Sequence, residues 1–212
     1  MIKNVIFDWD GTIADNTEVN YEIAMRVFKE FGAQRISLDD FRMKMRSPFM
    51  EFYNEFIPNL SFEDELKSFK KEAKKLGEEK LYKKIYPNAV NTLENLYKNG
   101  LTMVILSSGL KTAIIKGLEH HSIQKYFTDI QAEVADKVLA IKNIMQRNEF
   151  KQEETAIMGD MDSDIKAGKS AGITTIGVTY GVYSAKRIEE LSPDHLIHDF
   201  KELETIINNQ KQ

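Results

Sequence analysis

The chain has 212 residues, of which 42% are hydrophobic, and a formal net charge of −4, so we expect one large domain, or one domain with an inserted second lobe. It contains no cysteine, which excludes disulfides, thiolate catalysis and cysteine-ligated metal sites. Its first residues lack the basic and long apolar segments of a secretory signal or a membrane span, so we expect a cytoplasmic protein with no membrane partner.

The first predicted element is a buried strand over Lys3–Asp8, which ends in two carboxylates one residue apart. Side chains alternate along a strand, so Asp8 and Asp10 point to the same side, and Gly11 permits the sharp turn that follows. Two acids this close at a strand end indicate a cation or a shared chemical task. The pair suggests a nucleophile, a general acid/base and a metal ligand; the alternative is an ordinary polar turn.

The segment from about Asp15 to Tyr86 has no clear strand and predicts successive helices at 17–31, 38–45, 48–56 and 62–81. It contains most of the phenylalanines of the chain, so we expect a small lobe with its own apolar core. Two linkers, near residues 13–17 and 82–87, would join this lobe to the rest and form a hinge. We therefore predict a helical cap domain at 15–86 and a catalytic domain made of 1–14 and 87–212.

One predicted helix of this inserted segment is rich in lysine, at residues 70–75. Its lysines alternate with glutamates, which is typical of a solvated helix face rather than a nucleic-acid interface. We expect no nucleic-acid partner, and the sequence gives no basis for predicting an oligomeric state.

Strands and helices alternate along the remainder of the chain. Apolar runs predict strands at 102–107, 155–159 and 174–178, with a weaker one at 195–197, and helical periodicity covers 88–99, 110–119, 136–147 and 162–171. Strands that alternate with helices form a mostly parallel sheet with helices on both faces. The predicted fold is therefore α/β, a Rossmann-like sheet with a small helical cap domain inserted after the first strand.

Polar residues follow the predicted strands at the edge where α/β sheets bind ligands. Ser107 and Ser108 end the second strand, Asp160 and Asp164 follow the third, and Lys137 opens a helix between them. Carboxylates from two strand ends suit Mg²⁺, and a hydroxyl and a lysine suit phosphoryl oxygens. Considered singly, the serines are equally typical of helix caps, the lysine of a surface, and the acids of a helix N-terminus.

Four stretches, taken in order, resemble the signature motifs of the haloacid dehalogenase superfamily. They are Asp8–Thr12, Val104–Ser108, Lys137 and Met158–Asp164. Ala167–Ile173 also resembles the phosphoglycolate phosphatase-like branch, and the inserted segment resembles the small helical cap of that branch. The resemblance covers about 1–14 and 87–205, which is almost the whole predicted catalytic lobe.

The resemblance implies roles for the first-motif acids and the phosphate-binding residues. Asp8 matches the nucleophile, which is also a magnesium ligand. Asp10 matches the general acid/base, whose backbone carbonyl also reaches the metal. Ser107 matches the phosphate-binding hydroxyl, with Ser108 beside it, and Lys137 matches the lysine that binds phosphate and offsets the charge of the nucleophile.

In the last motif, Asp160 matches the direct metal ligand and Asp164 the second acid, which supports the metal or its water. The resemblance thus implies a Mg²⁺-dependent phosphatase that acts on a small phosphorylated metabolite through an aspartyl-phosphate. Phosphoglycolate and sugar phosphates are candidate substrates.

Other functions in the same superfamily stay open. Asp10 argues against a dehalogenase, which lacks this acid. A phosphomutase would share the catalytic set, a phosphonatase would need a cap lysine such as Lys44, and a non-catalytic phospho-ligand binding module would keep only the scaffold. In the predicted cap, Arg42, Lys44 and Arg46 lie close together in sequence and suit a substrate anion, with solvated surface cations as the alternative. Arg46 is the first choice, because it lies at the helix break before Ser47 and Pro48, where a loop can face the active site.

Overall fold

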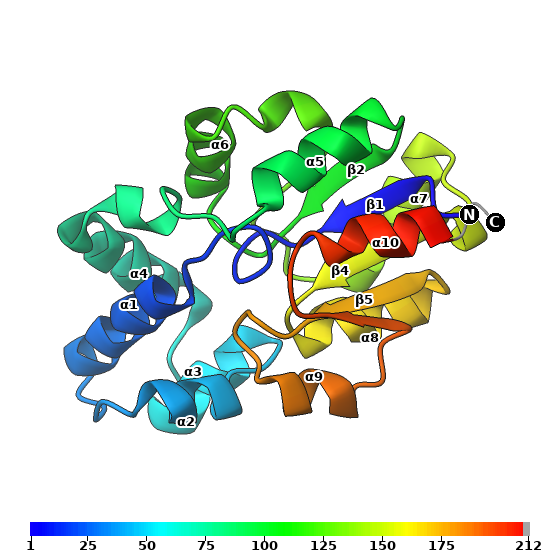
Figure 1. Ribbon diagram of the computed structural model, residues 1–212. Coiled ribbons are helices and arrows are strands. Elements are labelled where there is room, and N and C mark those ends of the chain that lie inside the picture. Colours follow the sequence, from blue (N-terminus) through cyan, green and yellow to red (C-terminus); the bar gives the residue numbers. More distant parts are fainter. Residues whose placement is uncertain (210–212) are drawn as a thin grey trace.

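A six-stranded sheet forms the framework of the molecule, in the order β3-β2-β1-β4-β5-β6, with all neighbouring strands parallel (Figure 1). The structure, a computed structural model, describes residues 1–209. The strands are β1 (Asn4–Phe7), β2 (Thr102–Leu106), β3 (Phe127–Gln131), β4 (Thr155–Gly159), β5 (Thr174–Val178) and β6 (His195–Ile197). The predicted Rossmann-like α/β fold is confirmed.

Helices cover both faces of the sheet. They are α5 (Ala89–Lys98), α6 (Lys111–His120), α7 (Lys137–Asn148), α8 (Asp162–Ala171), α9 (Ala185–Glu190) and α10 (Glu202–Asn209). Val5 and Phe7 pack in a cluster with α5, α6 and α10, whereas Ile6 packs with α7 and α8. Because successive side chains of a strand face opposite ways and both faces are covered, β1 continues from Asn4 as an unbroken apolar run, Val5 to Phe7.

One strand of the structure has no counterpart among the predicted elements, and one predicted helix end is misplaced. β3 lies at the edge of the sheet and contains Thr128 and Asp129, so it lacks the apolar run that marks a strand buried on both faces. The helix predicted at 62–81 is wrong in its last turn. It ends at Leu76, because Gly77 adopts a φ of 99°, and a separate 3-10 turn, η1 (Glu78–Leu81), follows.

Residues 15–86, here called the helical insert, lie beyond the tip of the β1 arrow in Figure 1. They contain α1 (Thr17–Glu30), α2 (Leu38–Lys44), α3 (Phe49–Phe56), α4 (Phe62–Leu76) and η1. Ser37 and Ser61 cap α2 and α4 by accepting a backbone N–H in the first turn, which satisfies a donor that the helix itself leaves free. Stacked aromatic rings, including Phe28 and Phe52, fill the space between the helices.

The two segments that join the helical insert to the sheet run side by side. Ala14 forms an antiparallel bridge with Ile85. The backbone N–H of Asp15 donates to the carbonyl of Lys84, and that of Tyr86 to the carbonyl of Ile13, both at 3.0 Å. The chain thus leaves the sheet and returns to it at one place.

The helical insert also packs on the loop that follows β5 and on α9. Val182 and Tyr183 of the loop and Ile188 of α9 belong to the same buried apolar cluster as Phe41 and Phe52 of the insert. The aromatic core of the insert is therefore completed by side chains from the sheet side of the molecule.

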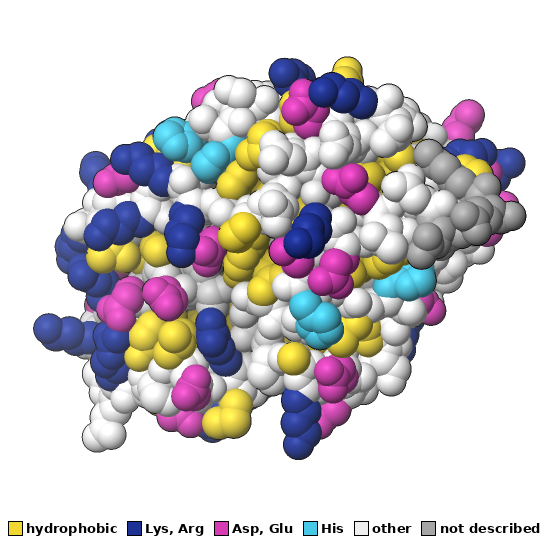
Figure 2. Space-filling model, in the orientation of Figure 1, with side chains coloured by type: hydrophobic (Ala, Val, Ile, Leu, Met, Phe, Trp, Pro, Cys, Tyr) yellow, Lys and Arg dark blue, Asp and Glu magenta, His cyan; other side chains and the backbone are white. Residues whose placement is uncertain are grey.

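Charged side chains of both signs cover the molecule. Figure 2 shows Lys and Arg interspersed with Asp and Glu on one face, without a continuous basic patch on that face. Within residues 1–209, every helix is too short or too polar to traverse a bilayer.

Glu65, on α4, is a buried acid in the core of the insert, 3% exposed. Burial raises the pKa of Glu65 to about 7, although a hydrogen bond from the Tyr53 hydroxyl opposes the shift. Because an unfolded glutamate titrates near 4.5, folding stability falls as the pH rises from 4.5 to 7 and the full penalty remains above 7.

The difference in unfolding free energy between Glu65→Gln and the wild type is therefore expected to grow from pH 5 to pH 8, in favour of the variant, by on the order of 3 kcal/mol. Denaturant unfolding of both proteins at the two pH values measures this gain. Glu63→Gln, an exposed neighbour on α4, serves as the matched control. An equal difference between Glu65→Gln and wild type at both pH values would contradict the titration of a buried Glu65.

Candidate active site

Three buried carboxylates meet at the carboxyl ends of β1 and β4, which are neighbours in the sheet. Asp8 follows β1, Asp160 follows β4, and Asp164 lies in the first turn of α8. One oxygen from each lies within 4.8 Å of the others. The structure thus brings Asp8 together with two acids that lie far from it in sequence.

Lys137 is the cation of this acidic cluster. It is the first residue of α7, whose N-cap Asp136 accepts the backbone N–H of Leu139 at 3.0 Å. Its Nζ lies 2.6 Å from Asp164 Oδ1 and 3.0 Å from Asp8 Oδ1. Burial disfavours the charge of Lys137, but Asp164 and Asp8 outweigh burial and raise its pKa. Lys137 therefore stays protonated beside both acids.

The acidic cluster keeps an excess of negative charge. Burial, and then the charges of Asp8 and Asp164, raise the pKa of Asp160 well above its usual value. One ammonium cannot offset three carboxylates in a buried site, where charges are poorly screened. Hard carboxylate oxygens at this spacing suit a divalent cation such as Mg²⁺, so the residues present fit a metal of that kind.

Asp10 lies beside the cluster and outside the group of three acids. Its Oδ1 accepts a hydrogen bond from Asn16 Nδ2, and its Oδ2 accepts one from Ser107 Oγ at 3.4 Å. Burial of the carboxyl group, then the charge of Asp8, raise the pKa of Asp10 to about 6, although the bond from Asn16 opposes the shift. A carboxyl group with a pKa near neutrality can both give and take a proton.

Asn16 is a site residue that the motifs of the sequence did not indicate. Its Nδ2 donates to Asp10 and also to the carbonyl of Leu81, at 3.0 Å. One side chain therefore joins the turn after β1 to η1, the last helical turn of the insert. It precedes α1 as the N-cap residue, and an asparagine there is so common that its type gave no functional signal.

Ser107 and Ser108 have different surroundings. Ser107 is buried, and its hydroxyl lies between Asp10 and the backbone N–H of Gly109, which donates to it at 3.0 Å. A Cβ at Gly109 would lie 2.0 Å from Asp10 Oδ2, so glycine is required for this approach. Ser108 is exposed.

Two donors hold the carboxylate of Asp160. The backbone N–H of Val182, in the loop after β5, donates to Oδ2 at 2.6 Å, and Thr12 Oγ1 donates to Oδ1 at 3.4 Å. Val182 is a second site residue that the sequence analysis missed, because a backbone donor leaves no trace in residue type.

The three candidate cations of the helical insert do not share one environment. Arg46 forms ion pairs with Glu55 at 2.8 Å and Glu51 at 3.6 Å, and Lys44 also pairs with Glu55. Both are therefore engaged within the insert.

Arg42 differs from these two cations. Its Nε is buried and has no hydrogen-bond partner among the described residues. Its charge lowers the pKa of Tyr86, a tyrosine whose pKa burial and then Asp160 raise. Of the three cations, Arg42 is thus the one with a buried, unpaired donor among the described residues. Its charge acts on Tyr86, the tyrosine that is also affected by the charge of Asp160.

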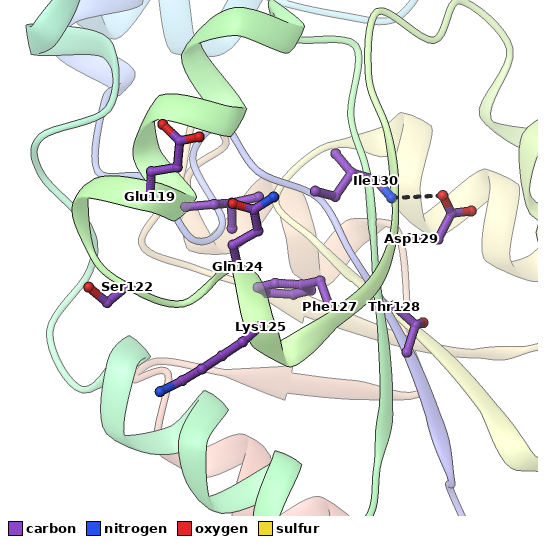
Figure 3. Close-up of a pocket in the computed structure, with 9 residues that line it drawn as sticks. Glu119, Ser122, Gln124, Lys125, Phe127, Thr128, Asp129 and Ile130 are labelled. Atoms are coloured by element: carbon purple, nitrogen blue, oxygen red, sulfur yellow. Dashed lines mark hydrogen bonds between the residues drawn. The ribbon is translucent and has the colours of Figure 1, made fainter.

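Two hollows lie outside the acidic cluster. One of about 760 Å³ lies between α6 and β3 and includes Glu119, Lys125 and Asp129 in its lining (Figure 3); none of the predicted site residues lines it. A smaller one of about 250 Å³ lies between α4 and η1 of the insert and α6, and includes Leu81 and Leu110. The smaller hollow is nearer the site, because the carbonyl of Leu81 accepts a hydrogen bond from Asn16, which also donates to Asp10.

Comparison with known proteins gives one family and a consistent set of relatives. The sequence profile of the haloacid dehalogenase-like hydrolases matches residues 5–178. The chain is 30% identical to a phosphoglycolate phosphatase of Vibrio parahaemolyticus over 58% of this chain and 56% of that protein, so the match spans about half of that relative. It is 23% identical to the pyrophosphatase PpaX of Oceanobacillus iheyensis over 98% of both chains.

Solved structures share the fold along the whole chain. The crystal structure of a predicted phosphatase from Clostridium acetobutylicum superposes with a TM-score of 0.84 at 22% identity and covers 99% of both chains. A predicted phosphoglycolate phosphatase from Haemophilus somnus gives 0.80 at 20% identity, over 97% of this chain and 98% of that one.

Proposed function

This chain belongs to the haloacid dehalogenase-like hydrolase family, and from that premise we propose that it is a Mg²⁺-dependent phosphatase acting on a small phosphorylated metabolite. One observation carries the proposal: the buried cluster of Asp8, Asp160 and Asp164 with Lys137 in contact with two of them. Asp10 beside it, with a raised pKa, supplies the acid that such a cluster needs to complete a phosphoryl transfer.

In the proposed first step, the Asp8 carboxylate attacks the phosphorus of the substrate. The new bond joins an Asp8 oxygen to phosphorus, and the bond between phosphorus and the ester oxygen breaks. Asp10 gives its proton to the departing oxygen, so the leaving group departs as a neutral alcohol. Lys137, the Ser107 hydroxyl and the backbone N–H groups of the loop that follows Ser107 bind phosphoryl oxygens.

In the second step, Asp10 acts in the opposite sense. As a carboxylate it removes a proton from a water molecule, whose oxygen attacks the phosphorus of the aspartyl-phosphate. The bond between phosphorus and Asp8 breaks, which releases inorganic phosphate and restores the Asp8 carboxylate and the Asp10 acid. One residue thus serves as acid and then as base, which suits its pKa of about 6.

Asp8 and Asp160 would hold the metal directly, with Asp164 supporting it and the backbone carbonyl of Asp10 as a further oxygen. When bound, a divalent cation offsets the repulsion between an anionic nucleophile and an anionic phosphate and stabilises charge in the transition state. Lys137 is positively charged, as the metal would be, and it contacts both Asp8 and Asp164. It therefore offsets negative charge of these two carboxylates that the metal would leave unbalanced.

We propose residues 15–86 as a cap domain that covers the acidic cluster and selects the substrate. Its position beyond β1 and its paired linkers support this assignment. Relatives named as phosphoglycolate phosphatase and pyrophosphatase point to small anionic phosphates, with phosphoglycolate and sugar phosphates as the candidates to test.

A phosphatase fits the geometry better than a phosphonatase does. A phosphonatase needs a cap lysine free to form a Schiff base, and Lys44 is paired with Glu55. A phosphomutase shares the catalytic set and differs in the fate of the phosphoryl group, whereas a binding module would bind phosphate esters without releasing phosphate.

Incubation of the purified protein with Mg²⁺ and a panel of phosphate esters distinguishes these functions. We expect release of inorganic phosphate from p-nitrophenyl phosphate and faster release from one anionic metabolite of the panel. Phosphorus NMR of the products separates hydrolysis from transfer to a second position of the substrate. Binding of every ester without phosphate release would refute the phosphatase.

Arg42→Ala is expected to raise KM, or lower kcat/KM, for an anionic metabolite by about tenfold to a hundredfold, because it removes one charged hydrogen bond worth about 1.5–3 kcal/mol. Initial rates with p-nitrophenyl phosphate, which offers no second anion, should change much less. Arg46→Ala is the comparison, since Arg46 is already paired with Glu51 and Glu55. A larger selective loss in Arg46→Ala would move the specificity role to Arg46.

A further inference from the structure

The loop after β5 joins a proposed metal ligand to the core of the helical insert. We propose that Tyr183 and Arg187 are positioning residues: by fastening this loop to the insert, they hold the Asp160 carboxylate in its metal-binding place. The inference rests on the proposed metal site at Asp160, and it adds residues outside that site to its function.

The backbone of the loop approaches Asp160 closely. The N–H of Val182 donates to Asp160 Oδ2 at 2.6 Å. A Cβ at Gly181 would lie 2.3 Å from Asp160 Cβ and 2.5 Å from the carbonyl oxygen of Gly11. No other residue fits at Gly181 without moving the loop, so the place of the loop and that of the carboxylate depend on each other.

The side chains of the same loop belong to the insert. Val182 and Tyr183 are 7% and 1% exposed and pack in the aromatic cluster that contains Phe41 and Phe52. A shift of the insert away from the sheet would therefore expose these two side chains and release the loop that carries the Val182 N–H.

Asp162 adds a polar connection on the other side of the loop. Its Oδ1 accepts the Tyr183 hydroxyl at 2.8 Å, its Oδ2 accepts Lys166 at 2.6 Å, and its carboxylate also accepts the backbone N–H of Ser47, which is part of the insert. Asp162 is the first residue of α8 and has no role in the proposed chemistry. It joins the insert and the loop to the helix that carries Asp164.

Arg187 completes the attachment. Its guanidinium lies 3.4 Å from the centre of the Tyr183 ring. Its Nη1 donates to the carbonyls of Arg42 and Met43, at 2.7 and 2.8 Å, in the last turn of α2. The carbonyls at a helix C-terminus lack partners within the helix and favour a cation, so Arg187 ties α2 to Tyr183 by stacking and hydrogen bonds together.

If these contacts only stabilised the fold, their loss would lower the melting temperature without changing metal affinity in the folded protein. The inference requires more. Because two coupled equilibria affect each other equally, loss of the attachment must weaken metal binding, and metal binding must strengthen the docking of the insert.

The experiment measures Mg²⁺ binding by calorimetry on the intact chain, with three variants. Arg187→Met keeps the bulk of the side chain and removes its donors, Tyr183→Phe removes only the hydroxyl, and Arg187→Lys keeps a donor without the planar stack. Lys169→Met is the matched control, since exposed Lys169 donates to the carbonyl of Leu191 in the same region and has no hydrogen bond to the insert within residues 1–209. Circular dichroism establishes that each variant is folded at the temperature used.

We expect Kd for Mg²⁺ to rise about tenfold in Arg187→Met, within the range usual for coupled sites, less in Tyr183→Phe and Arg187→Lys, and not in Lys169→Met. Mg²⁺ should also slow amide hydrogen exchange in residues 38–48 of the wild type, and this slowing should be lost in Arg187→Met. Wild-type Mg²⁺ affinity in folded Arg187→Met and Tyr183→Phe would overturn the inference. Failure of the wild type to bind Mg²⁺ would refute the proposed metal site itself, and the inference with it.

Discussion

Asp8→Asn is expected to lower kcat by on the order of 10³-fold or more, because an amide is nearly as large as a carboxylate but cannot act as the nucleophile. The other groups of the site would remain in place. Lys137 keeps its contact with Asp164, and the backbone N–H of residue 8 keeps its bond to the carbonyl of Met158 at 2.9 Å. We therefore expect a folded, inactive protein.

Steady-state hydrolysis and thermal unfolding of the same preparation test this expectation. Asp15→Asn is the control, since Asp15 is an acid of the neighbouring linker that pairs with Lys84 outside the acidic cluster. It should retain most of the activity. Near-normal kcat in a folded Asp8→Asn protein would remove Asp8 from the mechanism.

Removal of divalent cations is expected to abolish activity, and Mg²⁺ is expected to restore it. Three buried carboxylates face one lysine, so without a cation an anionic phosphate would enter a site of the same charge. Full activity after exhaustive chelation, measured with p-nitrophenyl phosphate, would contradict the metal assignment.

The same prediction has a readout that does not depend on turnover. A ligand that binds only the folded state stabilises it, by about 2.7 kcal/mol at one hundred times Kd. Mg²⁺ should therefore raise the melting temperature of the wild type. The rise should be lost in Asp160→Asn, and it should persist in Asp15→Asn.

The parts of the fold that were predictable have local causes. β1 is buried on both faces, and three of its four residues, Val5, Ile6 and Phe7, are apolar. β3, at the sheet edge, has only one well-covered face and carries Thr128 and Asp129, and nothing in its own residues distinguishes it from a loop. Gly77 ends α4 through a positive φ; glycine is a usual helix-stop signal, which the predicted helix 62–81 overlooked.

The candidate site divides in the same way. We could propose Asp8, Asp10, Lys137 and Asp160 from motifs, because their carboxylate and ammonium groups are the groups that the proposed chemistry needs. The support around them could not, since Val182 acts through its backbone N–H, which every residue type except proline possesses. Arg46 is favoured over Arg42 in the sequence because it lies at a helix break, whereas in the structure Arg46 pairs with Glu51 and Glu55 and Arg42 Nε has no hydrogen-bond partner among the described residues.

The bridge between Ala14 and Ile85 brings the entry and exit of the helical insert together. Because both ends lie side by side, everything between them can be lengthened, shortened or exchanged without separating β1 from β2 or moving Asp8. Loop-closure entropy grows only slowly with the length of such a segment, so even large replacements cost the sheet little. If the insert selects the substrate as proposed, this geometry lets substrate preference evolve by replacing one segment, provided that the replacement keeps the contacts with Asp10, Tyr183 and Arg187.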